Sequence, residues 1–181
     1  MYKKFARIIP AFLCIILIIA ISFSVLRNLF PHHHIDTIEK YCKKYGVNTN
    51  LVLAIVKAES NFKKDVVSHA GAKGIMQLTD ETFQFCAEKA ELETNNIFDI
   101  DTNLHAGVWY LSYLIERYDR NILNAGAAYN AGMGNVDKWL DNPDCSPDGK
   151  KLSDIPFSET KRYTEKINRY IVIYNILYKK R

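Results

Sequence analysis

Residues 51–60 carry the sequence LVLAIVKAES, in which seven of the ten residues are apolar. Such a stretch is apolar on most sides, and this is typical of a helix at the centre of a domain rather than on its surface. The helix is expected to begin after Asn48 or Asn50, since asparagine is a favoured N-cap residue. Glu59 then falls in its last turn. The rest of the domain is expected to pack around this helix.

Helical spacing continues on both sides of this central segment. Apolar residues recur every three or four positions, Gly46 stands where a helix would end, and Thr79 stands where one would begin. No segment shows the strict alternation of a convincing strand. The sequence therefore predicts an all-α domain. The expected helices cover residues 35–45, 80–90, 101–118, 122–129, 134–140 and about 158–177, and turn residues predict a loop over 141–149.

The N-terminus carries a candidate membrane segment. Nineteen residues from Ile8 to Leu26 contain no charge, and a helix of that length roughly spans the hydrocarbon core of a bilayer. Lys3, Lys4 and Arg7 precede it, which favours a cytoplasmic N-terminus and an extracytoplasmic body. We expect a single-pass protein of the cell membrane.

A cleavable signal peptide is the competing interpretation of the same segment. Its apolar region usually runs for about 7–15 residues and ends at small residues, whereas Ser22-Phe23-Ser24 matches that pattern poorly. A retained anchor is therefore favoured. We expect the chain to divide into a cytoplasmic stub with the anchor, residues 1–30, and a folded body, residues 31–181, which is long enough for one hydrophobic core.

The charge distribution argues against nucleic-acid binding. The net charge is +4, but residues 1–30 carry four basic residues and no acidic one, which leaves twenty of each sign in the body. A nucleic-acid-binding domain normally shows a basic excess of its own. The positive charge is therefore assigned to membrane topology.

Cysteines and histidines give weak signals for a disulfide or a metal. Cys42, Cys86 and Cys145 have no metal-binding spacing and allow at most one disulfide, so small apolar residues are the favoured interpretation. Three adjacent histidines, residues 32–34, point in different directions, whereas a metal site needs converging ligands. A polar linker leaving the membrane is favoured there, and no metal or cofactor is expected.

Glu59 is the candidate catalytic acid. Burial and the negative end of a helix dipole both disfavour a carboxylate anion, so both would raise its pKa. Cleavage of a glycosidic bond needs a carboxylic acid that is still protonated near neutral pH. A surface glutamate on an amphipathic helix is the alternative, and position alone does not decide between them.

Four sequence blocks stand out in the body, in this order: AESNF at 58–62, VSHAGAKGIMQL at 67–78, AAYNAG at 127–132 and IPFSETKRY at 155–163. Together they resemble the catalytic domain of the soluble-lytic-transglycosylase (SLT) type, whose fold is lysozyme-like and close to goose-type lysozyme. The second block is similar to the family's Gly-Leu-Met-Gln segment, and the third to its Ala-Tyr-Asn-Ala-Gly signature.

This resemblance implies that Glu59 serves as general acid and then as base. It also implies that residues around Glu59 contact the glycan strands of peptidoglycan. The expected substrate-binding residues are Ser60, Ser68, Met76, Gln77, Tyr129, Asn130, Glu159 and Tyr163. Two of them have an alternative interpretation, since Ser68 could instead close a loop and Met76 could fill the core.

The expected reaction follows from the lack of a second catalytic carboxylate. Asp65 follows two lysines in what is expected to be a solvated turn, and the resemblance does not make Glu159 a nucleophile. A lone acid suits a substrate that supplies its own nucleophile. In the family, the muramyl C6 hydroxyl closes a 1,6-anhydro ring after the bond between N-acetylmuramic acid and N-acetylglucosamine is broken. A hydrolytic muramidase of the same fold and a non-catalytic peptidoglycan-binding module are the alternatives.

Overall fold

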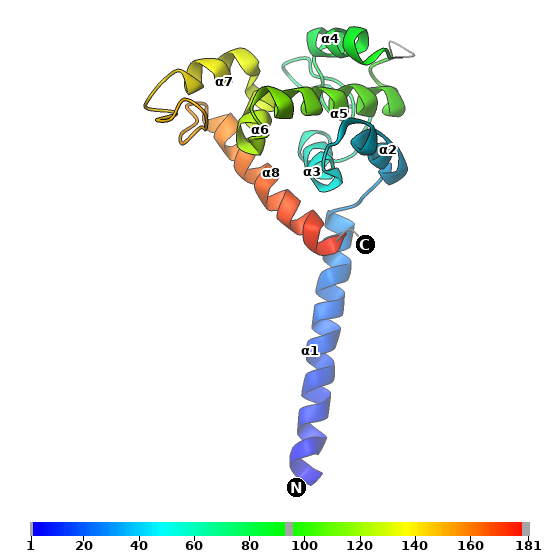
Figure 1. The fold of residues 1–181 in the computed structure, drawn as a ribbon. Coiled ribbons are helices and arrows are strands. Elements are labelled where there is room, and N and C mark those ends of the chain that lie inside the picture. Colours follow the sequence, from blue (N-terminus) through cyan, green and yellow to red (C-terminus); the bar gives the residue numbers. More distant parts are fainter. Residues whose placement is uncertain (1, 93–95, 179–181) are drawn as a thin grey trace.

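The computed structural model describes residues 2–92 and 96–178, and within these ranges it contains eight helices and no strand (Figure 1). The all-α fold expected from the sequence is therefore confirmed. Every helix expected in the body is present, with ends shifted by at most a few residues. The helices are α1 (Tyr2–Leu29), α2 (Ile35–Tyr45), α3 (Thr49–Glu59), α4 (Asp80–Ala90), α5 (Ile100–Arg117), α6 (Ile122–Ala131), α7 (Met133–Leu140) and α8 (Ser158–Leu177).

Local capping explains where the helices begin and end. The Asn48 side chain accepts hydrogen bonds from the backbone N–H groups of Asn50 and Leu51, so α3 begins at the first of the two expected positions. Thr79 caps α4 by accepting from the N–H of Thr82. Gly46 ends α2 in the left-handed conformation, with φ of 68°, which glycine adopts without strain.

The central helix α3 is buried as expected. All residues from Leu51 to Val56 are buried, and α3 packs mainly on α8 and also on α2. A second apolar cluster fills the space among α4, α5, α6 and α7, with Phe83, Leu114 and Trp139 among its members. The C-terminal end of α3, which carries Glu59, therefore lies on a rigid, packed scaffold.

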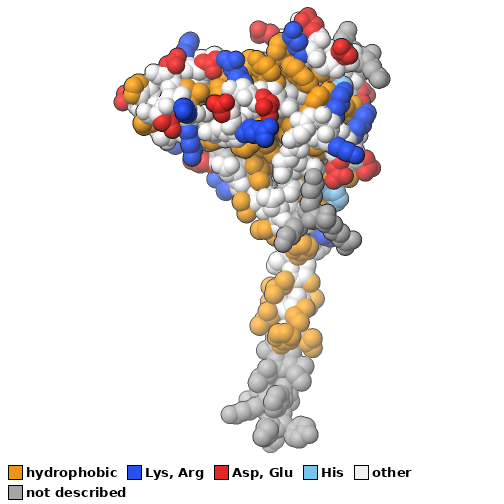
Figure 2. Space-filling view, in the orientation of Figure 1, with side chains coloured by type: hydrophobic (Ala, Val, Ile, Leu, Met, Phe, Trp, Pro, Cys, Tyr) orange, Lys and Arg blue, Asp and Glu red, His pale blue; other side chains and the backbone are white. Residues whose placement is uncertain are grey.

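The N-terminal helix projects from the domain (Figure 1). Residues Phe12–Leu29 of α1 are long and apolar enough to cross a membrane, with a mean hydropathy of 2.3, and none of them is buried in the structure. Figure 2 shows apolar side chains around the described part of α1, whereas the domain carries charges of both signs. The retained anchor and its single-pass topology stay predictions.

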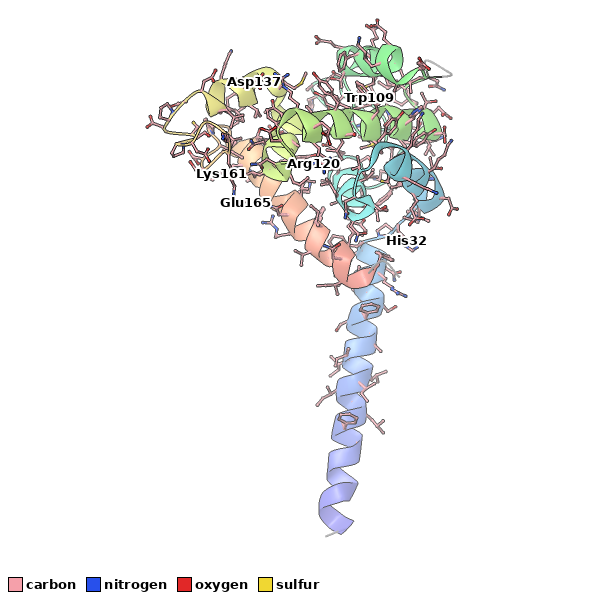
Figure 3. All side chains as sticks on the ribbon, in the orientation of Figure 1. His32, Trp109, Arg120, Asp137, Lys161 and Glu165 are labelled. Carbon is pink, nitrogen blue, oxygen red and sulfur yellow. The ribbon has the colours of Figure 1, made fainter. Side chains whose placement is uncertain are left out.

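The segment between α1 and α2 exposes its three histidines, residues 32–34, as expected of a polar linker, and it is also packed on the domain. Phe30 is 9% exposed and belongs to the core around α3. The hydroxyl of Tyr174 donates to the Pro31 carbonyl at 2.8 Å, and that of Tyr178 donates to the Phe30 carbonyl at 2.8 Å. His32, which Figure 3 labels beside the upper end of α1, has its ring 4.3 Å from that of Tyr178.

The cysteines of the body lie in the core. Cys42, Cys86 and Cys145 are all buried, and no disulfide joins them in the described structure. Burial raises the pKa of the Cys86 thiol to about 12, so this thiol stays protonated. Their place in the core agrees with the interpretation of these residues as small apolar side chains.

Candidate active site

Glu59 and Tyr163 meet although 104 residues separate them in the sequence. Glu59 is the last residue of α3, and Tyr163 projects from the second turn of α8, the helix on which α3 packs. The Tyr163 hydroxyl donates a hydrogen bond of 2.7 Å to Glu59 Oε1. The contact between α3 and α8 thus positions both side chains.

The environment of Glu59 favours its protonated form. Burial raises the pKa of this carboxyl from 4.5 to about 7, and the negative charge of Glu159 adds to the rise. The hydrogen bond from Tyr163 and the positive charge of Lys166 act in the opposite direction but do not cancel the effect of burial. A carboxyl with this pKa can donate a proton near neutral pH and accept one afterwards.

Two phenols accompany the acid. Burial raises the pKa values of Tyr129 and Tyr163 well above the usual value for tyrosine, and the nearby charge of Glu59 adds to the rise. Both hydroxyls therefore stay protonated and act as donors. The Tyr129 hydroxyl donates to the main-chain carbonyl of Met76 at 2.8 Å, which ties α6 to the segment before α4.

Gln77 holds together the loop that precedes α4, residues 66–78. Its side-chain nitrogen donates to the carbonyls of Val66 and Gly74, each at 2.9 Å, and its backbone has φ of 52°, a left-handed conformation that costs free energy in a residue other than glycine. The amide nitrogen is therefore committed to the loop. The amide oxygen is the atom of Gln77 that could accept a hydrogen bond from a sugar.

Ser68 closes the tip of the same loop. Its hydroxyl oxygen accepts from the backbone N–H of Ala72 at 3.0 Å, which matches the loop-closing alternative considered for it. Isolated β-bridges join Lys73 to Val67 and to Leu78, so the loop is a compact unit.

Met76 of the loop 66–78 and Ser60 at the end of α3 are both buried. Met76 is fully buried in the core around α3, which favours the core interpretation of its side chain. Ser60 is 6% exposed, and its hydroxyl lies within hydrogen-bonding distance of the Val56 carbonyl at 3.2 Å and the Ile75 carbonyl at 2.7 Å. It therefore connects the end of α3 to the loop 66–78. Direct contact of either side chain with substrate stays a prediction.

Asn130 and Glu159 lie where α6 meets the first turn of α8. The Asn130 side-chain oxygen accepts from the buried hydroxyl of Thr160 at 2.8 Å. Glu159 is exposed, and its charge reaches Glu59. The structure thus brings Tyr129, Glu159 and Tyr163 near the acid and places Asn130 against Thr160, the neighbour of Glu159. Their contacts with substrate stay predictions.

Two supporting residues were missed by the sequence analysis. Asn103 on α5 accepts from the Met76 N–H at 2.8 Å and donates to the Ile97 carbonyl at 2.8 Å. It therefore connects the loop 66–78 to α5. Lys166 on α8 donates to the Ala58 carbonyl at 3.1 Å, at the end of α3. The signal for Asn103 was a polar residue next to the apolar stripe of a helix. No local signal marked Lys166.

The chemistry available here is proton transfer by one carboxyl. Asp65 is exposed, and so is Glu159 at the start of α8. Neither is therefore a second buried carboxylate next to Glu59. Within the described ranges, no group of three or more His, Cys, Asp or Glu side chains is placed to hold a metal ion.

Comparison with known proteins identifies one family. A sequence profile of the transglycosylase SLT domain matches residues 36–151. The soluble lytic murein transglycosylase of Salmonella typhimurium is 30% identical over 154 residues, which cover 82% of this chain and 24% of that protein. Membrane-bound lytic murein transglycosylase C of Photorhabdus laumondii is 30% identical in an alignment of 184 positions that covers 82% of this chain and 50% of that protein.

A solved structure shows the same fold. The crystal structure of the 70 kDa soluble lytic transglycosylase of Escherichia coli matches with a TM-score of 0.76 and 27% identity, over 86% of this chain and 26% of that one. The chain thus spans 24% of the first of these curated relatives and 50% of the second. The similarity concerns a lysozyme-like helical domain that forms part of larger proteins.

Proposed function

The chain belongs to the transglycosylase SLT domain family, and we propose that it is a peptidoglycan lytic transglycosylase with Glu59 as its catalytic acid and base. The observation that carries the proposal is the environment of Glu59, which raises the pKa of its carboxyl. Glu59 ends a buried helix, accepts a hydrogen bond from Tyr163, and has its pKa raised to about 7. The relatives named lytic murein transglycosylases support the substrate class.

In the first step Glu59 donates its proton to the glycosidic oxygen between N-acetylmuramic acid and N-acetylglucosamine. The bond from the muramyl anomeric carbon to that oxygen breaks, and the sugar that leaves keeps the proton. The carboxylate formed on Glu59 is stabilised by the hydrogen bond from Tyr163 and by the nearby charge of Lys166. The acid can therefore lose its proton without being left as an isolated buried charge.

In the second step the Glu59 carboxylate accepts the proton of the muramyl C6 hydroxyl while that oxygen bonds to the anomeric carbon. The product is a 1,6-anhydromuramyl end, and no water is consumed. Because the nucleophile belongs to the same sugar, the step is intramolecular and can gain a large entropic advantage. This fits a site in which Glu59 has no second buried carboxylate beside it among the described residues.

Digestion of purified peptidoglycan by the full chain in detergent tests the proposal. Mass spectrometry is expected to find anhydromuramyl ends, and Glu59→Gln is expected to abolish their release because the amide cannot donate the proton. Products heavier by one water would show that the protein is a hydrolytic muramidase and not a transglycosylase. Full release by Glu59→Gln would remove Glu59 as the acid, and binding without release would favour the non-catalytic module.

We also propose that α1 is retained as a single-pass anchor, with residues 31–181 forming the extracytoplasmic catalytic domain. The apolar stretch Phe12–Leu29 and the similarity to a membrane-bound lytic murein transglycosylase support this placement. Fractionation tests it. The full-length mass should stay in the membrane fraction after alkaline extraction, whereas cleavage near Ser24 would release a shorter, soluble form.

A further inference from the structure

Lys57 and Lys166 lie close to each other near the C-terminal end of α3, and neither forms an ion pair with a carboxylate in the described structure. Lys57 precedes Glu59 by two residues on α3, and Lys166 reaches the end of α3 from α8. Six ion pairs within 4.0 Å are formed in the described part of the chain, and neither lysine takes part in any of them. These two positive charges are therefore not neutralised by a direct ion pair there.

The two ammonium groups lie on one pair of aromatic rings. Lys57 Nζ is 5.5 Å from the ring centre of Phe30, and Lys166 Nζ is 5.8 Å from that of Tyr170. These two rings contact each other edge to face, with centres 5.0 Å apart. The aromatic pair thus forms an apolar floor on which both cations are held.

The hydrogen-bond partners of both lysines are neutral. Lys57 Nζ donates to the side-chain oxygen of Asn61, and Lys166 Nζ donates to the Ala58 carbonyl at 3.1 Å. An ammonium group carries three N–H donors, so these bonds leave donors on both lysines for a ligand. The neutral acceptors also fix the positions of the two charges without neutralising them.

The two cations repel each other. Partial burial and the charge of Lys166 both lower the pKa of Lys57, which shows that the pair is close enough to interact. The charge of Lys166 also reaches Glu59. An anion bound at the two lysines would relieve the repulsion, and its contact with Lys166 would hold it near the candidate acid.

We propose that Lys57 and Lys166 form an anion subsite that receives a carboxylate carried by the muramyl residue at the cleavage site. The proposal rests on the proposed function, because that function places a muramyl residue at Glu59. N-acetylmuramic acid differs from N-acetylglucosamine by a lactyl ether on C3. The carboxylate is the lactyl group itself where no peptide is attached, or belongs to the attached peptide where one is present.

This subsite gives the lysines a role in specificity. A sugar without the lactyl ether is neutral and gains nothing from the pair, whereas the carboxylate of a muramyl residue is attracted by both positive charges and can accept a charge-assisted hydrogen bond. The pair would therefore favour the register in which a muramyl residue, rather than a glucosaminyl one, provides the anomeric carbon next to Glu59.

Calorimetric binding tests the subsite without turnover. The full chain carrying Glu59→Gln, in detergent, is titrated with three tetrasaccharides: muramyl glycan with peptide, muramyl glycan without peptide, and neutral chitotetraose. Lys57→Gln should weaken binding of the anionic glycans by about two- to fivefold, the range for a partly exposed ion pair. It should leave chitotetraose binding unchanged, and Lys57→Arg should restore most of the loss. The anionic glycan that loses more affinity identifies the carboxylate.

Salt provides a second measurement that needs no lysine variant. Binding of the anionic glycans should weaken with rising salt, while binding of chitotetraose should not. An equal loss for all three glycans on Lys57→Gln, or no loss for the anionic ones, would overturn the subsite while leaving the proposed function intact. Failure of every glycan to bind the Glu59→Gln parent would overturn both proposals.

Discussion

Glu59 has to hold a proton in order to start the proposed reaction, and its surroundings set the pH at which it can do so. Its pKa of about 7 predicts that kcat/KM falls as the pH rises above about 7, because the acid is then ionised. In Tyr163→Phe the hydrogen bond that stabilises the carboxylate is lost, so the pKa should rise and the falling limb should move to higher pH. The measurement is a pH profile of anhydromuropeptide release.

Tyr113→Phe is the matched control for that profile, since it removes a phenol hydroxyl from α5 rather than from the acid's hydrogen-bond partner. The falling limb of its pH profile should coincide with that of the parent. If the falling limb of the Tyr163→Phe profile stays in place or moves to lower pH, Tyr163 does not stabilise the ionised form of Glu59.

The raised pKa of Glu59 also predicts how stability depends on pH. The folded pKa of about 7 exceeds the reference value of 4.5 for an unfolded glutamate, so the stability gained from the protonated carboxyl is fully present below about 4.5 and is lost as the pH rises through 7. Glu59→Gln cannot ionise. Relative to the parent, it should therefore gain on the order of 1–3 kcal/mol of unfolding free energy between pH 4 and pH 8.

Urea unfolding of both proteins at the two pH values provides this measurement. An equal difference between variant and parent at pH 4 and pH 8 would show that the carboxyl titrates alike in the folded and unfolded chain. In that case the proposed acid would lack the elevated pKa on which its role depends.

The sequence predicted which residues belong to the site better than it predicted the contacts of each one. Glu59 and Tyr163 were both named, and the structure brings them together. The core position of Met76 was one of its two interpretations, and its burial favours that one. The buried bonds of Ser60 were not foreseen, because they depend on the loop 66–78 folding back on α3. Lys166 was missed because its partner, the Ala58 carbonyl, is 108 residues away and belongs to the backbone.

At the scale of elements, α5 supports the loop 66–78 through a close contact at Gly107. A Cβ atom added at Gly107 would lie 2.3 Å from the sulfur and 2.9 Å from the Cβ of the fully buried Met76. Gly107→Ala should therefore destabilise the domain by about 1–3 kcal/mol through overpacking, although alanine is the better helix former. It should also lower activity, since Met76 carries the carbonyl that accepts from Tyr129.

Gly126→Ala in α6 is the matched control, because a Cβ there would meet nothing within 4 Å. It should raise stability by about 0.5–1 kcal/mol, the usual gain of alanine over glycine inside a helix. Thermal unfolding of both variants distinguishes the cases. An equal gain in both would mean that α5 and the loop are not in close contact at Gly107.

Helices were predictable because spacing and caps are local, and the positions of Gly46, Asn48 and Thr79 as helix ends follow from their own chemistry. The loop 66–78 was not predictable in the same way. Its shape depends on Asn103 of α5 and on the left-handed backbone of Gln77, and neither can be deduced from the residues of the loop alone.

For the whole molecule, the feature that the sequence did not predict is the packing of the exit from α1 on the domain. The polar residues 32–34 are exposed as expected. Phe30, however, is part of the core, and Tyr174 and Tyr178 of the C-terminal region bond to its backbone and that of Pro31. These contacts join residues more than a hundred positions apart, which local patterns cannot reveal. They connect the candidate anchor directly to α8, the helix that carries Tyr163.

This connection predicts that the domain keeps a fixed orientation relative to α1 in a bilayer. Cys14 is exposed whereas the other three cysteines are buried, so spin labels at Cys14 and at Lys161→Cys, an exposed site on α8, report the distance between anchor and domain. In lipid nanodiscs the parent should give one narrow distance distribution. The double variant Tyr174→Phe and Tyr178→Phe removes both hydroxyl bonds and should broaden it, while Tyr113→Phe should not. A broad distribution in the parent would mean that the domain swings freely on its anchor, and the height of Glu59 above the membrane would then not be set by α8.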